Sequence, residues 1–367
     1  MRLLDYTCCL LYNAVGYPML SEICISLVVM IHSHLQNDRR QLPAGLCPPL
    51  LTIVFLLFSV ALSANERFEF TELHMGVDVR IILYAPSSEV AERVAKEAFA
   101  SFHALNAIMS DYDSESELML LDASRGWIRV SDDLFAVLKA AKHYSTISDG
   151  MFDVTVGPMV RLWRRSRRQQ ELPREQLVEQ AKQLVGNHLW EIDEKTQSVR
   201  LLKADMKFDL GAIAKGYAID KAFEIIERHG ITSQLVDAGG DFRLGAAPPG
   251  TEGWRIAKGD EIVWMKNTAM ATSGGRFQFV VIDGVRYAHI VDPRTGLGIT
   301  GSQTVHIIAP TAMEADTLAT AVILLGREKG QALIDKLLID KVAINNVPIN
   351  EVPKVSMEYV EPEHVEP

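Results

Sequence analysis

The stretch Met206–Asp220, MKFDLGAIAKGYAID, constrains the fold more than any other part of the chain. It predicts the end of a strand, a sharp turn at Gly211, and a helix that ends at Gly230. Glycines let the backbone approach a ligand closely, and the free N–H groups of a helix start attract anions. Lys215 lies in that start, where a cation opposes the helix dipole. Two interpretations are open: an anion-binding turn, or an ordinary strand-to-helix turn with a solvated lysine.

The composition excludes some classes of protein. The chain has 367 residues, of which 48% are hydrophobic and 23% charged, as in a globular protein of one large or two ordinary domains. Its net charge of −10 argues against binding that depends on neutralising phosphates. We therefore expect no nucleic-acid partner.

An apolar run near the N-terminus indicates an export signal. Residues 48–64, PPLLTIVFLLFSVALSA, follow Asp38-Arg39-Arg40 and end in small residues, as a signal peptide does. Cleavage near Ser63 or Ala64 would place the protein in the periplasm. The alternative is an uncleaved run that tethers the chain to the inner membrane. We expect an extension with signal over 1–64, the main domain over 65–350 and an acidic tail over 351–367.

The cysteines narrow the possible chemistry further. All four lie upstream of the predicted cleavage point: Cys8, Cys9, Cys24 and Cys47. The mature chain would therefore have no disulfide framework, no zinc-ribbon spacing and no cysteine nucleophile. Since Cys47 precedes the apolar run, a lipid-anchor cysteine at the cleavage site is also missing.

Strands and helices alternate without a regular βαβ rhythm. Apolar periodicity and capping residues predict helices over Ser87–Ile108, Asp132–Thr146, Pro173–Val185, Ala312–Leu325 and Lys329–Leu338. Alternating segments predict strands over Phe68–Tyr84, Gln234–Leu244, Phe277–Ile282, Tyr287–Val291 and Thr304–Ala309, and Asp283-Gly284 is typical of a hairpin turn. The pattern favours an α+β fold, one compact unit with largely antiparallel sheets and packed helices. We expect the tail from Glu351 to be frayed.

The run Arg164–Arg168 is strongly basic. It fits a solvated face or loop, and a surface that docks a partner is the alternative.

Several Gly- and Asp-rich loops suggest a pocket lined by backbone.

A second candidate for functional residues is the segment His289-Ile-Val-Asp292-Pro-Arg. His289 ends a predicted strand and Asp292 follows in the turn. A functional interpretation is a general base held by a carboxylate. The structural alternative is a turn histidine, with Asp292 capping the Pro-Arg turn.

Asp316 and Thr320 are four residues apart on a predicted helix and therefore share one face. A carboxylate and a hydroxyl suit Mg²⁺ when a phosphate completes the coordination. Alternatively, Asp316 lies in the first turn, where the helix dipole favours its negative charge, and the Thr320 hydroxyl forms a hydrogen bond to the backbone of its own helix.

Taken together, the motifs resemble those of the ApbE family of flavin transferases. The matches occur in order between Phe70 and Gly326: HMGV, SDYDSESELMLL, SDGMFDVTVGPMVRLW, DLGAIAKGYAID, LVDAGGD, ATSGG, HIVDPRTG and APTAMEADTLATA. The resemblance implies a T-fold-like domain that binds FAD with Mg²⁺, splits the pyrophosphate and transfers FMN to a Thr or Ser of a partner flavoprotein.

The resemblance also implies roles for individual residues. An FAD site would be formed by Met75, Tyr112, Met151, Phe152, Asp153, Lys215, Ala218 and Ile290. Asp316, Thr320 and the carbonyl of Ala212 would hold Mg²⁺. His289, with Asp292 beside it, would activate the acceptor hydroxyl.

Some positions depart from the family pattern. Val77 replaces a Thr that is common after Met-Gly, and Gly275-Arg276-Phe277 stands where many members have a Tyr-rich segment. Two other functions stay open: an FAD pyrophosphatase that yields FMN and AMP, and a flavin-binding carrier without turnover.

Overall fold

An antiparallel sheet of seven strands organises the part of the chain that the structure describes. This computed structural model describes residues 65–258, 261–276, 278–345 and 354–360, all within the unit Ala64–Pro367. The strands lie in the order β1-β2-β6-β7-β10-β14-β15, and every neighbouring pair is antiparallel. Their bounds are β1 Glu66–His74, β2 Val77–Ala85, β6 Gln234–Ala238, β7 Asp241–Leu244, β10 Thr268–Gly274, β14 Thr304–Ala309 and β15 Ser356–Val360.

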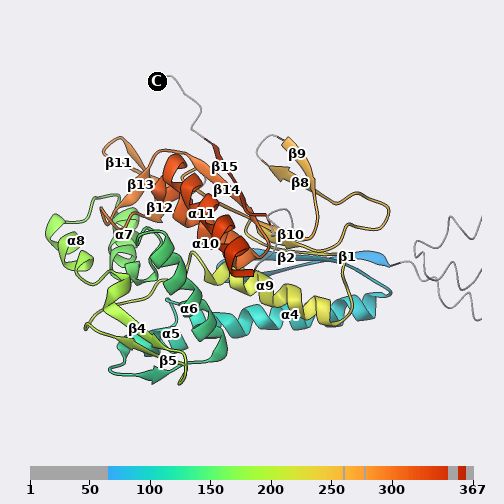
Figure 1. The fold of residues 1–367 in the computed structure, drawn as a ribbon, viewed down its shortest axis with the longest axis horizontal. Coiled ribbons are helices and arrows are strands. Elements are labelled where there is room, and N and C mark those ends of the chain that lie inside the picture. The colour runs from blue at the N-terminus through green and yellow to red at the C-terminus, as the bar shows by residue number, and fades with distance from the viewer. Residues whose placement is uncertain (1–64, 259–260, 277, 346–353, 361–367) are drawn as a thin grey trace, which may run out of the picture. The chain divides into compact units, whose positions relative to one another are not determined.

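Helices cover one face of this sheet (Figure 1). They are α4 (Ser88–Met109), α9 (Ala214–Arg228) and α10 (Ala312–Leu325), and α11 (Arg327–Asn345) packs against α10. The apolar faces of these helices meet the strand residues that point the same way, such as Val79, Ile81 and Leu83 in β2. The main hydrophobic core lies between these two layers.

The opposite face of the sheet carries the hairpin of β8 (Trp254–Lys258) and β9 (Glu261–Met265) (Figure 1). Here a smaller apolar cluster includes Ile82, Leu244 and Trp254. Ile82 alternates with Ile81 and Leu83 along β2, which is why neighbouring residues of one strand belong to different cores.

The remaining elements lie beyond one end of the sheet layer (Figure 1). Helices α5 (Glu117–Ala123) and α6 (Asp132–Ile147) accompany the small sheet β3 (Ile128–Arg129), β4 (Trp190–Asp193) and β5 (Ser198–Leu201). A third core cluster joins α7 (Gly157–Gln169) and α8 (Glu175–Lys182) to β11 (Phe279–Ile282) and β12 (Val285–Val291), with β13 (Gly298–Thr300) beside β12. The described residues also form the short 3₁₀ helices η1 (Val154–Val156) and η2 (Asn187–Leu189).

The predicted α+β fold with antiparallel sheets and packed helices is confirmed. The Asp283-Gly284 hairpin is also confirmed, with φ of 51° and 78° at its two turn residues.

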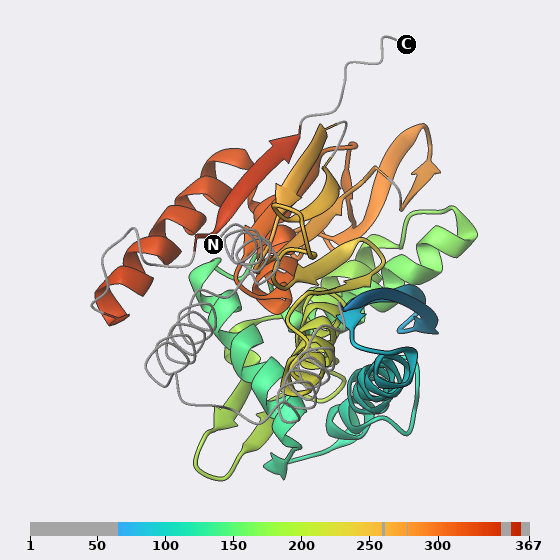
Figure 2. The ribbon, with the colours of Figure 1, turned by 90° about the vertical axis from the view of Figure 1, so that its right-hand side faces the viewer.

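Two local predictions are wrong. Residues 206–210 form no strand: the Phe208 N–H donates to Asp122 Oδ1 and the Asp209 N–H to the Val154 carbonyl, so these bonds do not go to a neighbouring strand. The tail is not frayed throughout, because Ser356–Val360 pairs with β14 as the edge strand β15 (Figure 2).

The predicted signal and extension over 1–64 and the boundary near residue 350 lie outside the described residues. Within the described ranges, no helix combines the length and apolarity needed to span a membrane.

Candidate active site

A cavity of about 280 Å³ collects side chains from distant parts of the chain. We call it the catalytic cavity. Most of the predicted site residues line it: Tyr112, Met151, Phe152, Asp153, Ala212, Lys215, His289, Ile290, Asp316 and Thr320. The structure therefore brings the predicted FAD, metal and base residues into one place.

Three predicted residues do not line the cavity. Met75 lies in the β1–β2 turn with φ of 49°. Ala218 is fully buried in α9, on the face that packs into the main core. The carboxylate of Asp292 accepts hydrogen bonds from Arg294 instead.

Lys215 lies in the first turn of α9, and its partly buried side chain forms an ion pair with the buried Asp241. Its Nζ is 2.5 Å from Asp241 Oδ2, and Asp241 Oδ1 accepts the Thr272 N–H at 2.9 Å. Burial opposes the charge of Lys215, but the attraction of Asp241 and then Asp316 outweighs it and raises the pKa of Lys215. Lys215 therefore stays cationic in a cavity that can take a phosphate.

Oxygen atoms converge at the adjoining wall. Asp316 is buried, its Oδ2 accepts the Gly216 N–H at 3.1 Å, and burial raises its pKa although Lys215 acts in the opposite direction. Thr320 Oγ1 lies 3.2 Å from Ser273 Oγ, and both residues line the cavity.

This donor set fits Mg²⁺. Asp316 Oδ1 has no hydrogen-bond donor among the described residues, and the hydroxyls of Thr320 and Ser273 are hard oxygen ligands. Among those same residues no group of three or more His, Cys, Asp or Glu could hold a metal. A single carboxylate with neutral oxygens suits a magnesium ion whose coordination a phosphate completes.

His289 lies on β12, exposed at the cavity wall. Its Nδ1 is 3.4 Å from the backbone carbonyl oxygen of Gln278, which can only accept a hydrogen bond. Nδ1 therefore carries the proton in this contact, and Nε2 keeps its lone pair. Desolvation by the surrounding protein lowers the pKa of His289, and Arg167 and Lys215 act in the same direction. The ring is thus neutral at pH 7 and able to accept a proton.

The predicted contact between His289 and Asp292 is not formed. Asp292 is buried, and its carboxylate accepts hydrogen bonds from the backbone N–H, Nε and Nη2 of Arg294. Side chains alternate along an extended chain, so residues three apart point to opposite faces. Asp292 holds the Pro-Arg turn, and the Gln278 carbonyl takes the place predicted for it.

Arg164 is the site residue that the sequence interpretation missed most clearly. The basic run was predicted as a solvated face or loop; it lies in α7, where Arg165 and Arg168 are exposed as predicted, but Arg164 is half-buried. Its guanidinium pairs with Asp111 and, at 2.8 Å, with Asp209, and it stacks over the ring of Tyr112. The only sequence signal for this contact is the acidic character of the SDYD and DLGA motifs, whose Asp111 and Asp209 could have been predicted to pair with a cation.

Apolar side chains form much of the rest of the cavity. Met151 and Phe152 are buried beside Ile290 and Leu324, a surface that suits a flat aromatic ring. Asp153 also lines the cavity and is buried; it accepts hydrogen bonds from the N–H and hydroxyl of Thr155, and burial raises its pKa.

Comparison with known proteins agrees with this arrangement. The model of the ApbE family matches residues 75–343. The chain belongs to the ApbE family.

Relatives and solved structures extend the match over most of the chain. FAD:protein FMN transferase from Treponema pallidum is 32% identical over 299 residues, covering 73% of this chain and 82% of that protein. The protein of the same name from Chlamydia muridarum is 29% identical, over 75% and 89%. A histidine-to-glycine mutant of the Vibrio cholerae flavin transferase ApbE superposes with a TM-score of 0.70 at 26% identity, covering 82% of this chain and 95% of that one. As an ApbE family member with such relatives, the chain is an enzyme of the transferase class.

Proposed function

We propose that this chain is a Mg²⁺-dependent FAD:protein FMN transferase. The observation that carries the proposal is the convergence of Lys215, the Asp316–Thr320 oxygens and a neutral His289 on one cavity. The names of the relatives support flavin transfer in general.

The reaction is a phosphoryl-group displacement. The hydroxyl of an acceptor Thr or Ser attacks the phosphorus of the FMN half, a new P–O bond forms, and the bond to the AMP phosphate breaks. The acceptor proton passes to Nε2 of His289, and AMP leaves with the bridging oxygen. Atoms balance: FAD and a protein hydroxyl give FMN-protein, AMP and a proton.

Each group of the chain has a task in this scheme. Lys215 binds the pyrophosphate and stabilises its charge, while the apolar wall around Phe152 orients the ring system. Asp316, Thr320 and the carbonyl of Ala212 would hold the metal. When bound, Mg²⁺ would neutralise charge on the leaving AMP phosphate.

The exposure of His289 favours a second activity of the same site. Water that reaches Nε2 could replace the acceptor, which would give free FMN and AMP. The carrier without turnover is disfavoured, since such a protein needs neither a base nor a metal site.

We also propose that the enzyme acts in the periplasm on a membrane redox subunit or a secreted flavoprotein. The apolar run over 48–64 supports this. Fractionation of the protein with periplasmic or membrane markers would support the proposal, and recovery of the protein in the cytoplasmic fraction would contradict it.

The experiment that tests the activity combines the purified protein with FAD, Mg²⁺ and an acceptor domain bearing a Ser/Thr-Gly-Ala-Thr/Ser segment. Flavin fluorescence that stays with the acceptor in a denaturing gel supports the transferase. Free FMN and AMP without labelling would indicate the hydrolase, and bound FAD without AMP the carrier.

A further inference from the structure

A second cavity, of about 640 Å³, lies outside the catalytic cavity. We call it the basic cavity. Five cationic side chains line it, against the two carboxylates of Asp122 and Asp205: Arg125, Arg161, Arg165, Arg168 and Lys207. The whole chain has a net charge of −10, so this concentration of positive charge runs against its overall balance.

Helix α7 separates the two cavities by presenting different faces to each. One face, with Met159 and Trp163, packs into the third core cluster. Val160, Arg164 and Arg167 line the catalytic cavity. Arg161, Arg165 and Arg168, spaced by four and three residues, line the basic cavity. A ligand in the basic cavity would therefore contact α7 on a face next to the one that lines the catalytic cavity.

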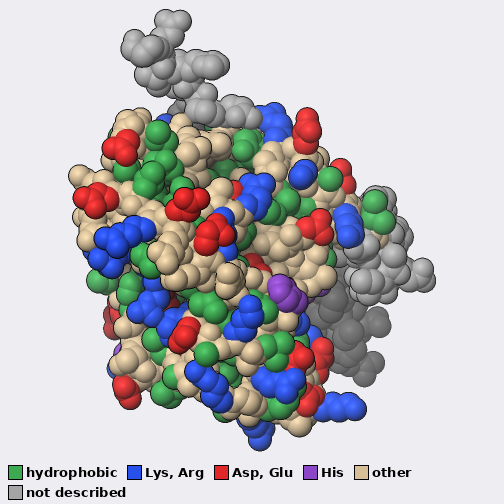
Figure 3. Space-filling view, turned by 90° about the vertical axis from the view of Figure 1, so that its left-hand side faces the viewer, with side chains coloured by type: hydrophobic (Ala, Val, Ile, Leu, Met, Phe, Trp, Pro, Cys, Tyr) green, Lys and Arg blue, Asp and Glu red, His purple; other side chains and the backbone are tan. Residues whose placement is uncertain are grey.

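The cations on this face are poorly neutralised by the protein itself. Arg161 and Arg168 are exposed and have no hydrogen bond or ion pair among the described residues. Arg165 Nε donates to Gln169 Oε1, and Lys207 Nζ is 3.7 Å from Asp122 Oδ2. Like charges one helical turn apart cost stability, so the folded protein keeps an unfavourable arrangement that an anionic ligand would relieve. Figure 3 views the side of the unit where α7 and α8 lie, with Lys and Arg side chains among the acidic ones.

We propose that the basic cavity docks an acidic polypeptide segment of the acceptor protein, so that the acceptor's Thr or Ser reaches His289 across α7. The inference rests on the proposed function. A concave site with apolar Pro158 and Leu162 between its cations fits a chain that carries spaced carboxylates. A flat lipid surface does not fit such a hollow, and cations spread over three positions of α7 suit carboxylates spaced along a chain better than one compact phosphate.

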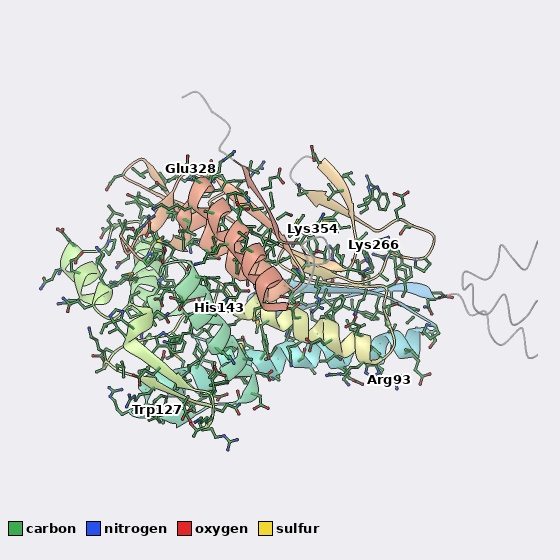
Figure 4. All side chains as sticks on the ribbon, viewed as in Figure 1. Arg93, Trp127, His143, Lys266, Glu328 and Lys354 are labelled. Atoms are coloured by element: carbon green, nitrogen blue, oxygen red, sulfur yellow. The ribbon has the colours of Figure 1, made fainter. Side chains whose placement is uncertain are left out.

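The test reverses charge where folding does not depend on it. The double variant Arg161→Glu/Arg168→Glu should raise KM for the acceptor by about tenfold or more and flatten its salt dependence, with kcat and FAD affinity unchanged. Arg161→Lys/Arg168→Lys should stay near wild type, because it keeps the charge. Arg93→Glu is the matched control: Arg93 is exposed on α4, away from α7 (Figure 4), and its reversal should change nothing.

A direct binding measurement separates this proposal from the proposed function. Fluorescein-labelled hexaglutamate is titrated into the full-length wild type and the variants, beside phosphatidylglycerol vesicles and inorganic pyrophosphate. Peptide binding that the double reversal abolishes supports the basic cavity even if the wild type labels no acceptor. Unchanged acceptor KM and unchanged peptide binding in that variant would overturn it. Loss of vesicle or pyrophosphate binding alone would also overturn it, in favour of a lipid or phosphate site.

Discussion

His289 Nδ1 faces the backbone carbonyl oxygen of Gln278 at 3.4 Å, while Asp292 is bound to Arg294. The proposed base is therefore oriented by the main chain of the β11–β12 hairpin and not by a carboxylate. A backbone carbonyl fixes the tautomer without adding a negative charge. Desolvation lowers the pKa of His289, and the hydrogen bond to Gln278, which acts in the opposite direction, does not outweigh it.

Replacing the base should slow chemistry without loss of binding. We expect His289→Ala to lower the transfer rate by about two to four orders of magnitude, the usual loss for a general base, with FAD affinity close to wild type. Asp292→Asn is the matched control and should retain most activity, because its contacts lie within the Pro-Arg turn. Single-turnover rates and FAD titration check both variants, and equal losses in the two would contradict the orientation described above.

The acidic decline of transfer activity should occur at a lower pH than an ordinary histidine would give. A base must be deprotonated, and desolvation by the surrounding protein lowers the pKa of His289 below its ordinary value of 6.5. Activity should therefore persist as pH falls through 6.5 and decline only at lower pH. The measurement is kcat/KM for the acceptor between about pH 5 and pH 8; a limb centred above 6.5 would be inconsistent with this environment.

Asp316 should control metal binding. Asp316→Asn keeps an oxygen for the Gly216 N–H but removes the charge, so Mg²⁺-dependent turnover should fall by at least about a hundredfold. The stabilisation of the folded protein by Mg²⁺ or Mn²⁺ in a thermal melt should disappear in parallel. Glu328→Gln, on an exposed residue of α11 (Figure 4), provides the control. A metal-induced rise in Tm equal to wild type would remove Asp316 from the ligand set.

The buried carboxyl of Asp122 should make stability depend on pH. Burial raises its pKa to about 7, against an ordinary value of 3.8, and its Oδ2 has no hydrogen-bond partner within the described part of the chain. Between these values the folded state holds a proton that the unfolded state has released, so the free energy of unfolding falls as pH rises. Asp122→Asn should remove that dependence and be the more stable protein above pH 7, by about 1 kcal/mol or more. Urea melts across this range, with exposed Asp205→Asn as control, provide the comparison; parallel curves would refute the assignment.

Gly216 should tolerate no side chain. A Cβ there would lie 2.4 Å from the Ala312 carbonyl oxygen, which is backbone and cannot rotate away. We expect Gly216→Ala to destabilise the protein by about 1–3 kcal/mol and to displace Asp316 from α9, with weaker metal binding as a consequence. A thermal melt measures the first effect, and an unchanged Tm would show that α9 and α10 can separate without cost.

Periodicity and capping predicted most helices and strands because those signals are local. Ser87 caps α4, and apolar residues such as Val94 and Phe102 recur at helical spacing. β15 escaped prediction because its pairing with β14 depends on a distant strand and not on its own acidic sequence.

In the candidate site, too, local relationships were predictable from the sequence and contacts between distant residues were not. Asp316 and Thr320 share a helix face, which spacing alone reveals, and motif order added the other lining residues. The partners of Lys215 and Arg164 are Asp241, Asp111 and Asp209, which lie elsewhere in the sequence. Only the folded chain brings such charges together, and only it shows that Asp292 turns away from His289.

The most direct test of the proposed activity is an intact-mass measurement of the acceptor after incubation with FAD and Mg²⁺, with AMP quantified in the same sample. The account predicts a mass increase of one FMN phosphoester on a Thr or Ser, with one AMP released for each acceptor modified. AMP and free FMN at equal rates with and without acceptor, and no mass increase, would contradict it.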